Sequence, residues 1–524
     1  MKALSPDIHK RIYFFGLCVI AIGMPLSAFL MSVGQFILLG NWLLEGNLIK
    51  KTQLFWHNKI AVIVASVMVM HLLGLLYTND IDYAFKDIRI KVPLLALPLF
   101  IATTPPLSKQ LFNWLMAVFI ASVVVGTFIS MGVYFGIIHT KHPVENVHDI
   151  SIFISHIRFS LMICLSVFIL AYYFYTSTSF VDKAASGIVI VWLLIFLTIL
   201  NSLTGIVVLV VVTVIILLHN IFTTGGLVVR ISAFTGLLAV LVMLYFYVDP
   251  IVKSARVSHK IDFSALDKTT ALGNAYNHDT LSVQTENGYP LFIYVCLDEL
   301  KSSWDEISSM KFDGKNKKGE DIKFTLIRYL TSKGLRKDAE AVRSLSTNEI
   351  KAIENGIANV NYVGKSAVTT RIMETFWEFN DFNTGGNMNG HSAVMRIEFW
   401  KAGLGIFKND PLIGVGTGDI KNAYKEQYNK MDSPLNETHR LRSHDQYISI
   451  AVAFGLIGLI WFLITLVYPF VKNKLWKDYF YFVFLLIAVL SFLNEDTLET
   501  QSGVTFFAFF NALFLFGRKN SVKG

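Results

Sequence analysis

Long apolar segments recur along the whole chain and constrain its fold more than any other feature. Between Tyr13 and Phe516 about twelve can be counted, if membrane spans of roughly 15–25 residues are accepted. Hydrophobic residues make up 53% of the chain and charged residues only 16%, which excludes an ordinary soluble protein. We therefore predict an all-α polytopic membrane protein, since helices satisfy their own backbone hydrogen bonds in lipid.

Lysine and arginine in the short loops predict the orientation, because cytoplasmic loops retain positive charge. With an even number of spans these residues all fall on one side, so both termini are predicted to be cytoplasmic. They are Lys2, Lys10, Arg11, Lys50, Lys51, Lys59, Lys109, Lys183, Arg230, Lys472, Lys474, Lys477, Arg518, Lys519 and Lys523. The formal charge of +8 is mostly this signal, and no interleaving of basic and aromatic residues predicts nucleic-acid binding.

The apolar segments divide the chain into three regions. Residues 1–248 are predicted to form an N-terminal bundle of about nine spans, and residues 444–524 a C-terminal bundle of about three spans with a cytoplasmic tail. Residues 249–443, between spans nine and ten, are long enough for a mainly helical extracytoplasmic domain. There we expect a turn at Asn287-Gly288 followed by an amphipathic helix, and another helix that starts at Thr347.

His444 stands directly in front of an uninterrupted apolar run, in "RSHDQYISIAVAFGLIGLIW". Ser443 and Gln446 fit a capping box, which would make His444 the first helical residue. A helix N-terminus favours phosphate, and histidine can act as a base near neutral pH. Asp445 would compete with such a phosphate or orient the histidine. The alternative is that His444 merely lies at the membrane interface.

Arginines near this histidine are candidates for binding an anionic substrate. Arg440 and Arg442 lie just upstream of it. Arg396 and Trp400 are one helical turn apart and share a face. Because arginine keeps its charge, Arg396 is expected to clamp a phosphate or carboxylate rather than transfer protons. The alternatives are a surface ion pair for Arg396 and core packing for Trp400.

Two further polar stretches lie at predicted span ends. His156 and Arg158 enter a span from the outer side, where a charge is functional if it faces the bundle interior and an interfacial anchor otherwise. A short outer loop carries Glu495, Asp496 and Glu499. These carboxylates could hold arginines or the histidine in place, or simply be solvated.

The remaining motifs narrow the chemistry. Gly414, Gly416 and Gly418 in "GVGTG" are expected to form a tight turn, because the strand and acid of a dinucleotide-binding motif are missing. No metal-binding or nucleophile motif is found, so neither metal nor cofactor is expected. A site of arginines and one histidine suits a substrate with its own leaving group, such as a lipid pyrophosphate. We find no repeats and expect no charge mid-span, with His71 interpreted as a satisfied packing residue, which disfavours a transporter.

The order of these residues resembles the bacterial O-antigen ligase and polymerase superfamily. Arg396 is followed by "FW" and "PLIGVGTG", then by His444 at the start of a span, and then by Gly455 and Gly458 at the family's spacing. "TLIRYLTSKGLRKDAEAV" also resembles ligase-domain members. The motifs cover roughly residues 396–461, and the topology extends the resemblance across the chain.

This resemblance implies an inverting, metal-independent transfer of a glycan from undecaprenyl pyrophosphate to an acceptor hydroxyl. The acceptor is lipid A-core in the ligase branch, another repeat unit in the polymerase branch and a protein side chain in a third. Arg396 would bind the pyrophosphate, and His444 would act as general base or orient the acceptor. Gly455 and Gly458 would let the tenth span pack closely against a neighbour. The site would lie on the periplasmic face of a bacterial inner membrane, in contact with membrane lipid.

Two positions depart from the family pattern. The residue after the histidine is usually Asn, Ser or Gln, and here it is Asp445. The family arginine at the outer start of a mid-chain span is replaced by Leu203. We predict that Arg158 substitutes for it, ahead of Arg371 and Arg440. The similarity of the loop sequence "TLIRYLTSKGLRKDAEAV" to ligase-domain members favours a ligase of lipopolysaccharide biosynthesis. A polymerase, a protein O-oligosaccharyltransferase and a transporter of lipid-linked glycans are the alternatives.

Overall fold

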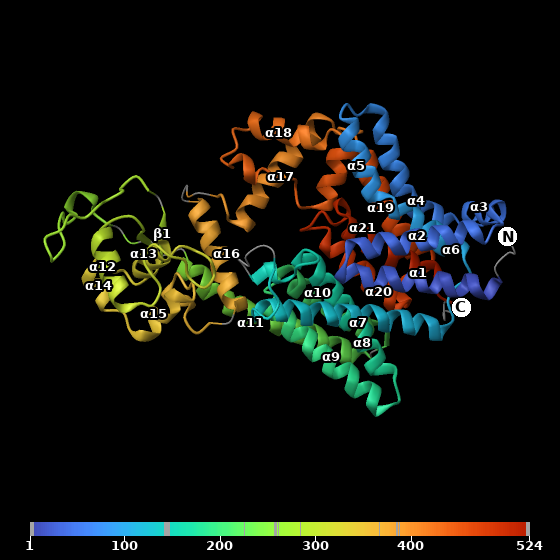
Figure 1. Ribbon diagram of the computed structural model, residues 1–524, viewed down its shortest axis with the longest axis horizontal. Helices are drawn as coiled ribbons and strands as arrows, with labels where there is room; N and C mark the ends of the chain where they lie inside the picture. Colours follow the sequence, from blue (N-terminus) through green and yellow to red (C-terminus); the bar gives the residue numbers. More distant parts are fainter. Residues whose placement is uncertain are drawn as a thin grey trace. The chain divides into compact units, whose positions relative to one another are not determined.

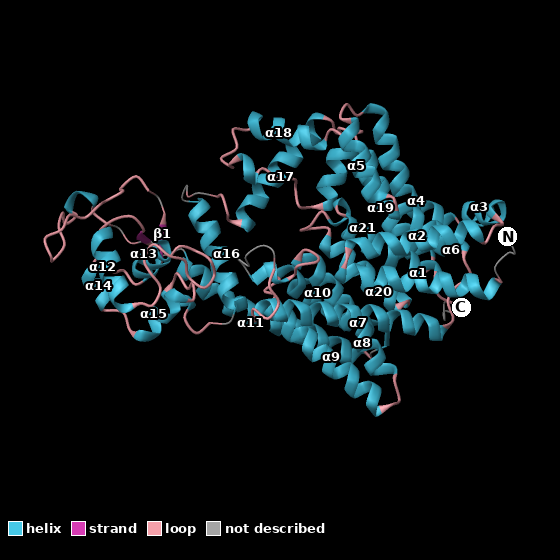
Figure 2. Ribbon diagram, viewed as in Figure 1, coloured by secondary structure: helices cyan, strands magenta, loops and turns pink. Residues whose placement is uncertain are grey.

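The computed structural model describes residues 5–140, 147–224, 226–255, 259, 261–282, 284–365, 367–383, 386 and 388–519. Within these ranges helices dominate, and the named strands form one short pair, β1 (Thr285–Glu286) and β2 (Tyr289–Pro290) (Figure 2). The prediction of an all-α protein is therefore confirmed.

The chain packs as two compact units, one of residues 1–142, 148–217 and 396–524 and the other of residues 143–147 and 218–395. The helices that lie wholly or mostly in the first unit are α1 (Pro6–Leu26), α2 (Ala28–Leu44), α3 (Leu48–His57), α4 (Lys59–Leu73), α5 (Ile81–Lys91), α6 (Pro93–Thr103), α7 (Lys109–Tyr134), α8 (His156–Thr176), α9 (Phe180–Ile199), α10 (Leu203–Thr224), α17 (Ser392–Asn409), α18 (Ile420–Lys430), α19 (Gln446–Lys472), α20 (Tyr479–Ser491) and α21 (Gln501–Phe516) (Figure 1). Those of the second unit are α11 (Leu227–Ala255), α12 (Leu297–Ile307), α13 (Ile322–Ser332), α14 (Ala339–Arg343), α15 (Thr347–Glu354) and α16 (Ala367–Asn383). The three regions expected from the sequence are divided by their predicted position in or outside a membrane. The packing of the chain does not test that division, so it stays a prediction.

Eight helices in the described part of the chain are long and apolar enough to cross a membrane, and α2 with α3, bent by 113°, would make a ninth. The multi-pass prediction is therefore confirmed. The sequence gives a higher count because it includes three shorter apolar helices, α6, α20 and α21, of 11, 13 and 16 residues.

Helix α21 is the centre of the first unit because it is apolar on every side. All its residues from Gly503 to Leu515 are buried, and it packs against α6 and α20 (Figure 1). On α20, the ring of Phe484 lies 6.0 Å from that of Phe507 and 5.9 Å from that of Phe514. The segment between α20 and α21 is therefore held at both ends by core helices.

This connecting segment, residues 492–500, folds back over the start of α21. A Cβ atom at position 503 would lie 1.9 Å from the carbonyl oxygen of Thr497, so the close approach requires Gly503. The side-chain oxygen of Gln446 accepts a hydrogen bond from the Leu498 N–H at 2.7 Å. The start of α19 is thereby joined to the segment that carries the predicted carboxylates.

The second unit has a core of its own, in which Trp304 is completely buried. The turn predicted at Asn287-Gly288 is confirmed, since both residues have positive φ, 49° and 85°, and connect β1 to β2. The helix predicted at Thr347 is α15, which begins with a capping box of Ser346 and Glu349.

Candidate functional site

The residues in front of α19 differ from the predicted capping box. The helix begins at Gln446, and its N-cap is Asp445, whose carboxylate accepts a hydrogen bond from the Ile448 N–H at 2.9 Å. The prediction that Ser443 caps the helix and that His444 is its first residue is wrong. His444 has a φ of +49°, a left-handed conformation that cannot start a right-handed helix, and aspartate caps as well as serine. The helix N-terminus is thus occupied by a protein carboxylate.

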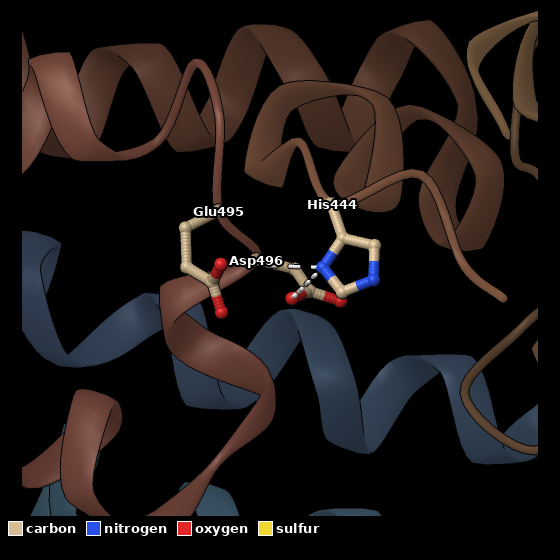
Figure 3. Close-up of side chains that lie close together, drawn as sticks. All are labelled: His444, Glu495 and Asp496. Atoms are coloured by element: carbon tan, nitrogen blue, oxygen red, sulfur yellow. Dashed lines mark ion pairs between the residues drawn. The ribbon is translucent and has the colours of Figure 1, made fainter. Parts of the chain in front are cut away.

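His444 lies beside two carboxylates of the segment between α20 and α21 (Figure 3). Its Nδ1 is 3.7 Å from Asp496 Oδ1 and 4.0 Å from Glu495 Oε2. The imidazole also packs against the ring of Phe399 on α17, with 5.6 Å between centroids. Its side chain is 30% exposed, whereas those of Glu495 and Asp496 are 6% and 10% exposed. Buried carboxylates therefore face one nitrogen of a histidine that is still accessible.

Glu495 connects His444 to the predicted arginines. Nη2 of Arg158 donates a hydrogen bond to Glu495 Oε1 at 2.6 Å, on the other oxygen from the one nearest His444. Burial raises the pKa of the Glu495 carboxyl, and the positive charges of Arg158 and Arg396 offset part of that rise. The charge of Arg396 therefore acts on the same carboxylate. The structure brings His444, Arg158 and Arg396 to one site.

His444 and the two carboxylates beside it could hold a metal ion. His444, Glu495 and Asp496 each offer one ligand atom, and these atoms lie within 4.8 Å of one another, the only such group found in the described part of the chain. One imidazole with two carboxylates suits zinc or a similar divalent ion. A metal would have to compete with Arg158 for the charge of Glu495. The expectation that the site needs no metal stays a prediction.

Arg442 meets a different carboxylate, Glu499. Its Nη1 lies 2.5 Å from Glu499 Oε2, and its guanidinium is 5.5 Å from the centre of the Tyr83 ring. Lys91 Nζ lies 3.0 Å from the same Glu499 oxygen and 2.6 Å from Asp87 Oδ1. Burial would raise the pKa of Glu499, but the charges of Lys91 and Arg442 outweigh it and hold that pKa below its usual range. Of the two alternatives that the sequence leaves open for the loop carboxylates, the structure shows the one in which they hold arginines in place.

The first unit buries charged residues that the sequence does not lead one to expect. Lys91 is completely buried and Asp87 is 4% exposed, at the junction of α5 and α6. The interpretation of His71 as a satisfied packing residue is wrong, because neither ring nitrogen has a hydrogen-bond partner among the residues that the structure describes. Its Nδ1 lies 3.7 Å from Asp87 Oδ2. The one sequence feature that could have indicated this buried pair is that Asp87 and Lys91 are one helical turn apart directly before an apolar run.

Helix α19 is broken at Gly455, which has φ 63° and ψ −161°. Residues 411–416 fit into the break and form hydrogen bonds with the backbone groups of α19 on both sides of it. The Leu456 N–H donates to the Pro411 carbonyl at 2.8 Å, and the Gly416 N–H donates to the Ala453 carbonyl at 2.8 Å. The predicted tight turn is therefore a segment that inserts into a transmembrane helix.

Close backbone contact explains why glycine stands at this joint. A Cβ at Gly455 would lie 2.2 Å from the carbonyl carbon of Leu412, and one at Gly414 would lie 2.5 Å from the backbone of α19. Gly418 follows the inserted segment and approaches the Asp80 carbonyl. Gly458 lies one turn beyond the break. Gly455 thus admits a loop rather than the neighbouring helix that the sequence predicts.

Three predicted substrate-binding side chains have other partners or surroundings. Arg440 donates hydrogen bonds to the Leu435 carbonyl at 2.9 Å and to Asn429 Oδ1 at 2.6 Å, which braces the chain before α19. Arg371 belongs to the second unit, where it pairs with Glu374 and Glu378 at 3.3 Å each. Trp400, on α17, has a buried indole N–H that meets no hydrogen-bond partner in the described part of the chain.

Leu203 marks the position of the missing family arginine. It is the first residue of α10 and is 39% exposed. The hydroxyl of the next residue, Thr204, accepts a hydrogen bond from Asn494 at 2.8 Å, directly before Glu495 in the chain. An arginine at position 203 would therefore start a helix beside the site that Arg158 occupies.

Comparison with known families supports this location. Residues 356–463, about a fifth of the chain, match the family described as O-antigen ligase. The matched region contains Arg396, the inserted glycine segment and His444, and it confirms the resemblance to the O-antigen ligase superfamily. The family supports a ligase- or polymerase-type function with glycosyltransferase-like activity. No match to the chain is found among curated proteins.

Proposed function

We propose that this member of the O-antigen ligase superfamily transfers a glycan from undecaprenyl pyrophosphate to an acceptor hydroxyl of lipid A-core. The reaction would take place on the periplasmic face of a bacterial inner membrane, with both termini cytoplasmic. One observation carries the proposal: His444 lies 3.7 Å from Asp496 and 4.0 Å from Glu495, and Arg158 holds the other oxygen of Glu495. This arrangement supports a base and a cation at one site.

His444 is the base in this proposal. A carboxylate beside Nδ1 favours the tautomer with its proton on Nδ1, which leaves Nε2 free to accept a proton. Nε2 takes the proton from the acceptor hydroxyl while the hydroxyl oxygen attacks the anomeric carbon. The bond from that carbon to the pyrophosphate oxygen breaks, and its electron pair leaves with the pyrophosphate. One displacement from the opposite face inverts the anomeric centre.

Arg158 and Arg396 stabilise the charge that develops on the departing pyrophosphate. Arg158 supplies the positive charge that the family places at the Leu203 position. Its ion pair with Glu495 at 2.6 Å fixes the guanidinium before the substrate arrives, so little reorganisation is needed. Neither arginine has to change its protonation state.

Complementation tests the proposal. A strain lacking the gene would carry wild type, His444→Ala, Arg396→Ala or Arg158→Ala at matched expression. We expect wild type to attach glycan to lipid A-core, and the variants to leave it on the lipid carrier. A change in polymer length would support a polymerase, and glycosylated protein would support a protein O-oligosaccharyltransferase. If all four attach glycan equally well, the assigned site is wrong.

A transporter of lipid-linked glycans is the second candidate. The break in α19 at Gly455 and the buried Lys91 favour it, because transporters place polar sites at interrupted helices. Purified protein in detergent separates the two functions. A transferase forms the glycosylated acceptor from donor and acceptor in one compartment, and a transporter forms none.

A further inference from the structure

Four residues of alternating charge form a line beside the candidate site. They follow one another in the order Asp87, Lys91, Glu499 and Arg442. The successive distances are 2.6 Å, 3.0 Å and 2.5 Å, each between a nitrogen and a carboxylate oxygen. Their side chains are 4%, 0%, 8% and 20% exposed, so Arg442 is the exposed end of the line.

The charges of this line are unevenly placed. Lys91 and Arg442 both contact Oε2 of Glu499, so two positive charges share one carboxylate oxygen. The charge that balances them, Asp87, lies at the other end, where it contacts Lys91 and faces His71 Nδ1 at 3.7 Å. Charges at these distances interact strongly in a low-dielectric interior. The line is neutral as a whole, but its exposed end at Arg442 is positive.

Stability alone does not explain why these charges are buried. An apolar set of similar volume often stabilises a fold as well as a buried ion pair does. Ionisable groups inside membrane bundles are usually functional. Arg442 is two residues before His444, and the Tyr83 ring at 5.5 Å helps to fix its guanidinium. The positive end of the line is therefore close in sequence to the proposed base.

We propose that Asp87, Lys91 and Glu499 are positioning residues that make Arg442 a binding group for a phosphate or pyrophosphate anion. Glu499 holds the guanidinium in place, and Lys91 prevents Glu499 from neutralising it. Asp87 holds Lys91 and moderates its charge. Where the inference rests on the proposed function, the anion is the pyrophosphate of the lipid-linked donor.

A single variant at Asp87 and a double variant at Asp87 and Lys91 test this arrangement, because their expected effects on binding are opposite. Asp87→Asn removes the negative charge at the far end and is expected to tighten binding of inorganic pyrophosphate about fivefold. Lys91→Met combined with Asp87→Asn also removes the nearer positive charge and is expected to weaken binding about fivefold. Damage to the fold can only weaken binding. Tighter binding by Asp87→Asn therefore distinguishes positioning from a purely structural role.

The measurement is isothermal titration of inorganic pyrophosphate into the full-length protein in phosphatidylcholine nanodiscs. Arg442→Gln should weaken binding more than any of the other substitutions, because it removes the binding group itself. Arg518→Gln is the matched control, because Arg518 also pairs with a buried carboxylate, Asp478, but at the opposite ends of α20 and α21. It should leave binding unchanged. Unchanged or weaker binding by Asp87→Asn would overturn the proposal.

A second series with phosphatidylglycerol in the nanodiscs identifies the source of the anion. Competition by this lipid that follows the same pattern of variants assigns the site to a headgroup phosphate. Absence of competition assigns it to the pyrophosphate of the donor. Glycan transfer is measured separately on the same preparations. Binding with the expected pattern but without transfer would contradict the proposed function and leave this inference standing.

Discussion

The substitution Gly455→Ala tests the joint between α19 and residues 411–416. The backbone angles of Gly455, φ 63° and ψ −161°, cost a residue with a side chain about 1–3 kcal/mol. A new Cβ would lie 2.2 Å from the carbonyl carbon of Leu412, so the inserted segment must move. The hydrogen bonds from Leu456 N and Ile457 N would then be lost, at about 1 kcal/mol each. Together these effects predict a loss of about 3–5 kcal/mol in the free energy of unfolding.

Thermal unfolding measured with a thiol-reactive dye suits this prediction, because Cys164 is buried and its exposure on unfolding should raise the dye signal. Gly455→Ala should lower the midpoint by about 5 °C or more. Gly40→Ala is the control, since Gly40 lies in a helix and its new Cβ would meet no described atom within 4 Å apart from its chain neighbours and the backbone of its own helix, so its midpoint should not fall. If Gly455→Ala unfolds at the wild-type temperature, the break does not depend on the inserted segment and the reasoning is refuted.

Three further outcomes are expected. When Leu203→Arg is added to Arg158→Gln, the double variant should recover at least about a tenth of the transfer rate that Arg158→Gln removes, because position 203 starts α10 next to the site. A double variant as inactive as Arg158→Gln alone would contradict this. A chelator should leave the transfer rate unchanged if the carboxylates orient His444, whereas a loss that a divalent ion restores would assign them to a metal. Burial would raise the pKa of Glu349, but hydrogen bonds from Lys333 and Ser346 outweigh it and hold that pKa at about 2. The ionised Glu349 therefore stabilises the fold fully above its ordinary pKa of 4.5, and this stabilisation is lost as the pH falls towards 2. Glu349→Gln should therefore reduce hydrogen-exchange protection of α15 by about 1–2 kcal/mol at neutral pH and remove its acid dependence; equal acid dependence in both proteins would contradict the assignment.

Features that depend on neighbouring residues are predicted well from the sequence. Apolar runs mark the membrane helices because each run must be buried or face lipid. The turn at Asn287-Gly288 and the start of α15 are likewise confirmed, since positive φ and capping depend on a few adjacent residues. At Ser443 and Asp445 two good caps compete, and only the left-handed backbone of His444 decides between them.

Pairing between distant residues could not be predicted in the same way. Lys91 meets Glu499 across 408 positions, so its sequence surroundings show only a charge before an apolar run. The surroundings of His71 could not be predicted for the same reason, because the carboxylate that it faces, Asp87, lies on another helix. The glycines at 414 and 455 are noticeable in the sequence, but nothing local indicates that one segment enters a break in the other. A candidate site of arginines, one histidine and nearby loop carboxylates can thus be predicted, whereas the pairing of each carboxylate with its cation needs the fold.

The break at Gly455 divides α19 into two pieces, residues 446–454 and residues 456–472. The first piece is fastened to residues 411–416 and, through Gln446, to the segment 492–500. The second piece is joined to the same residues by the Leu456 and Ile457 N–H groups, and its Phe462 ring lies 5.7 Å from that of Phe492. Long apolar helices tilt when bilayer thickness changes. Because the two pieces meet at a break in the helix, we expect the joint at Gly455 to take up part of such a tilt before it reaches His444.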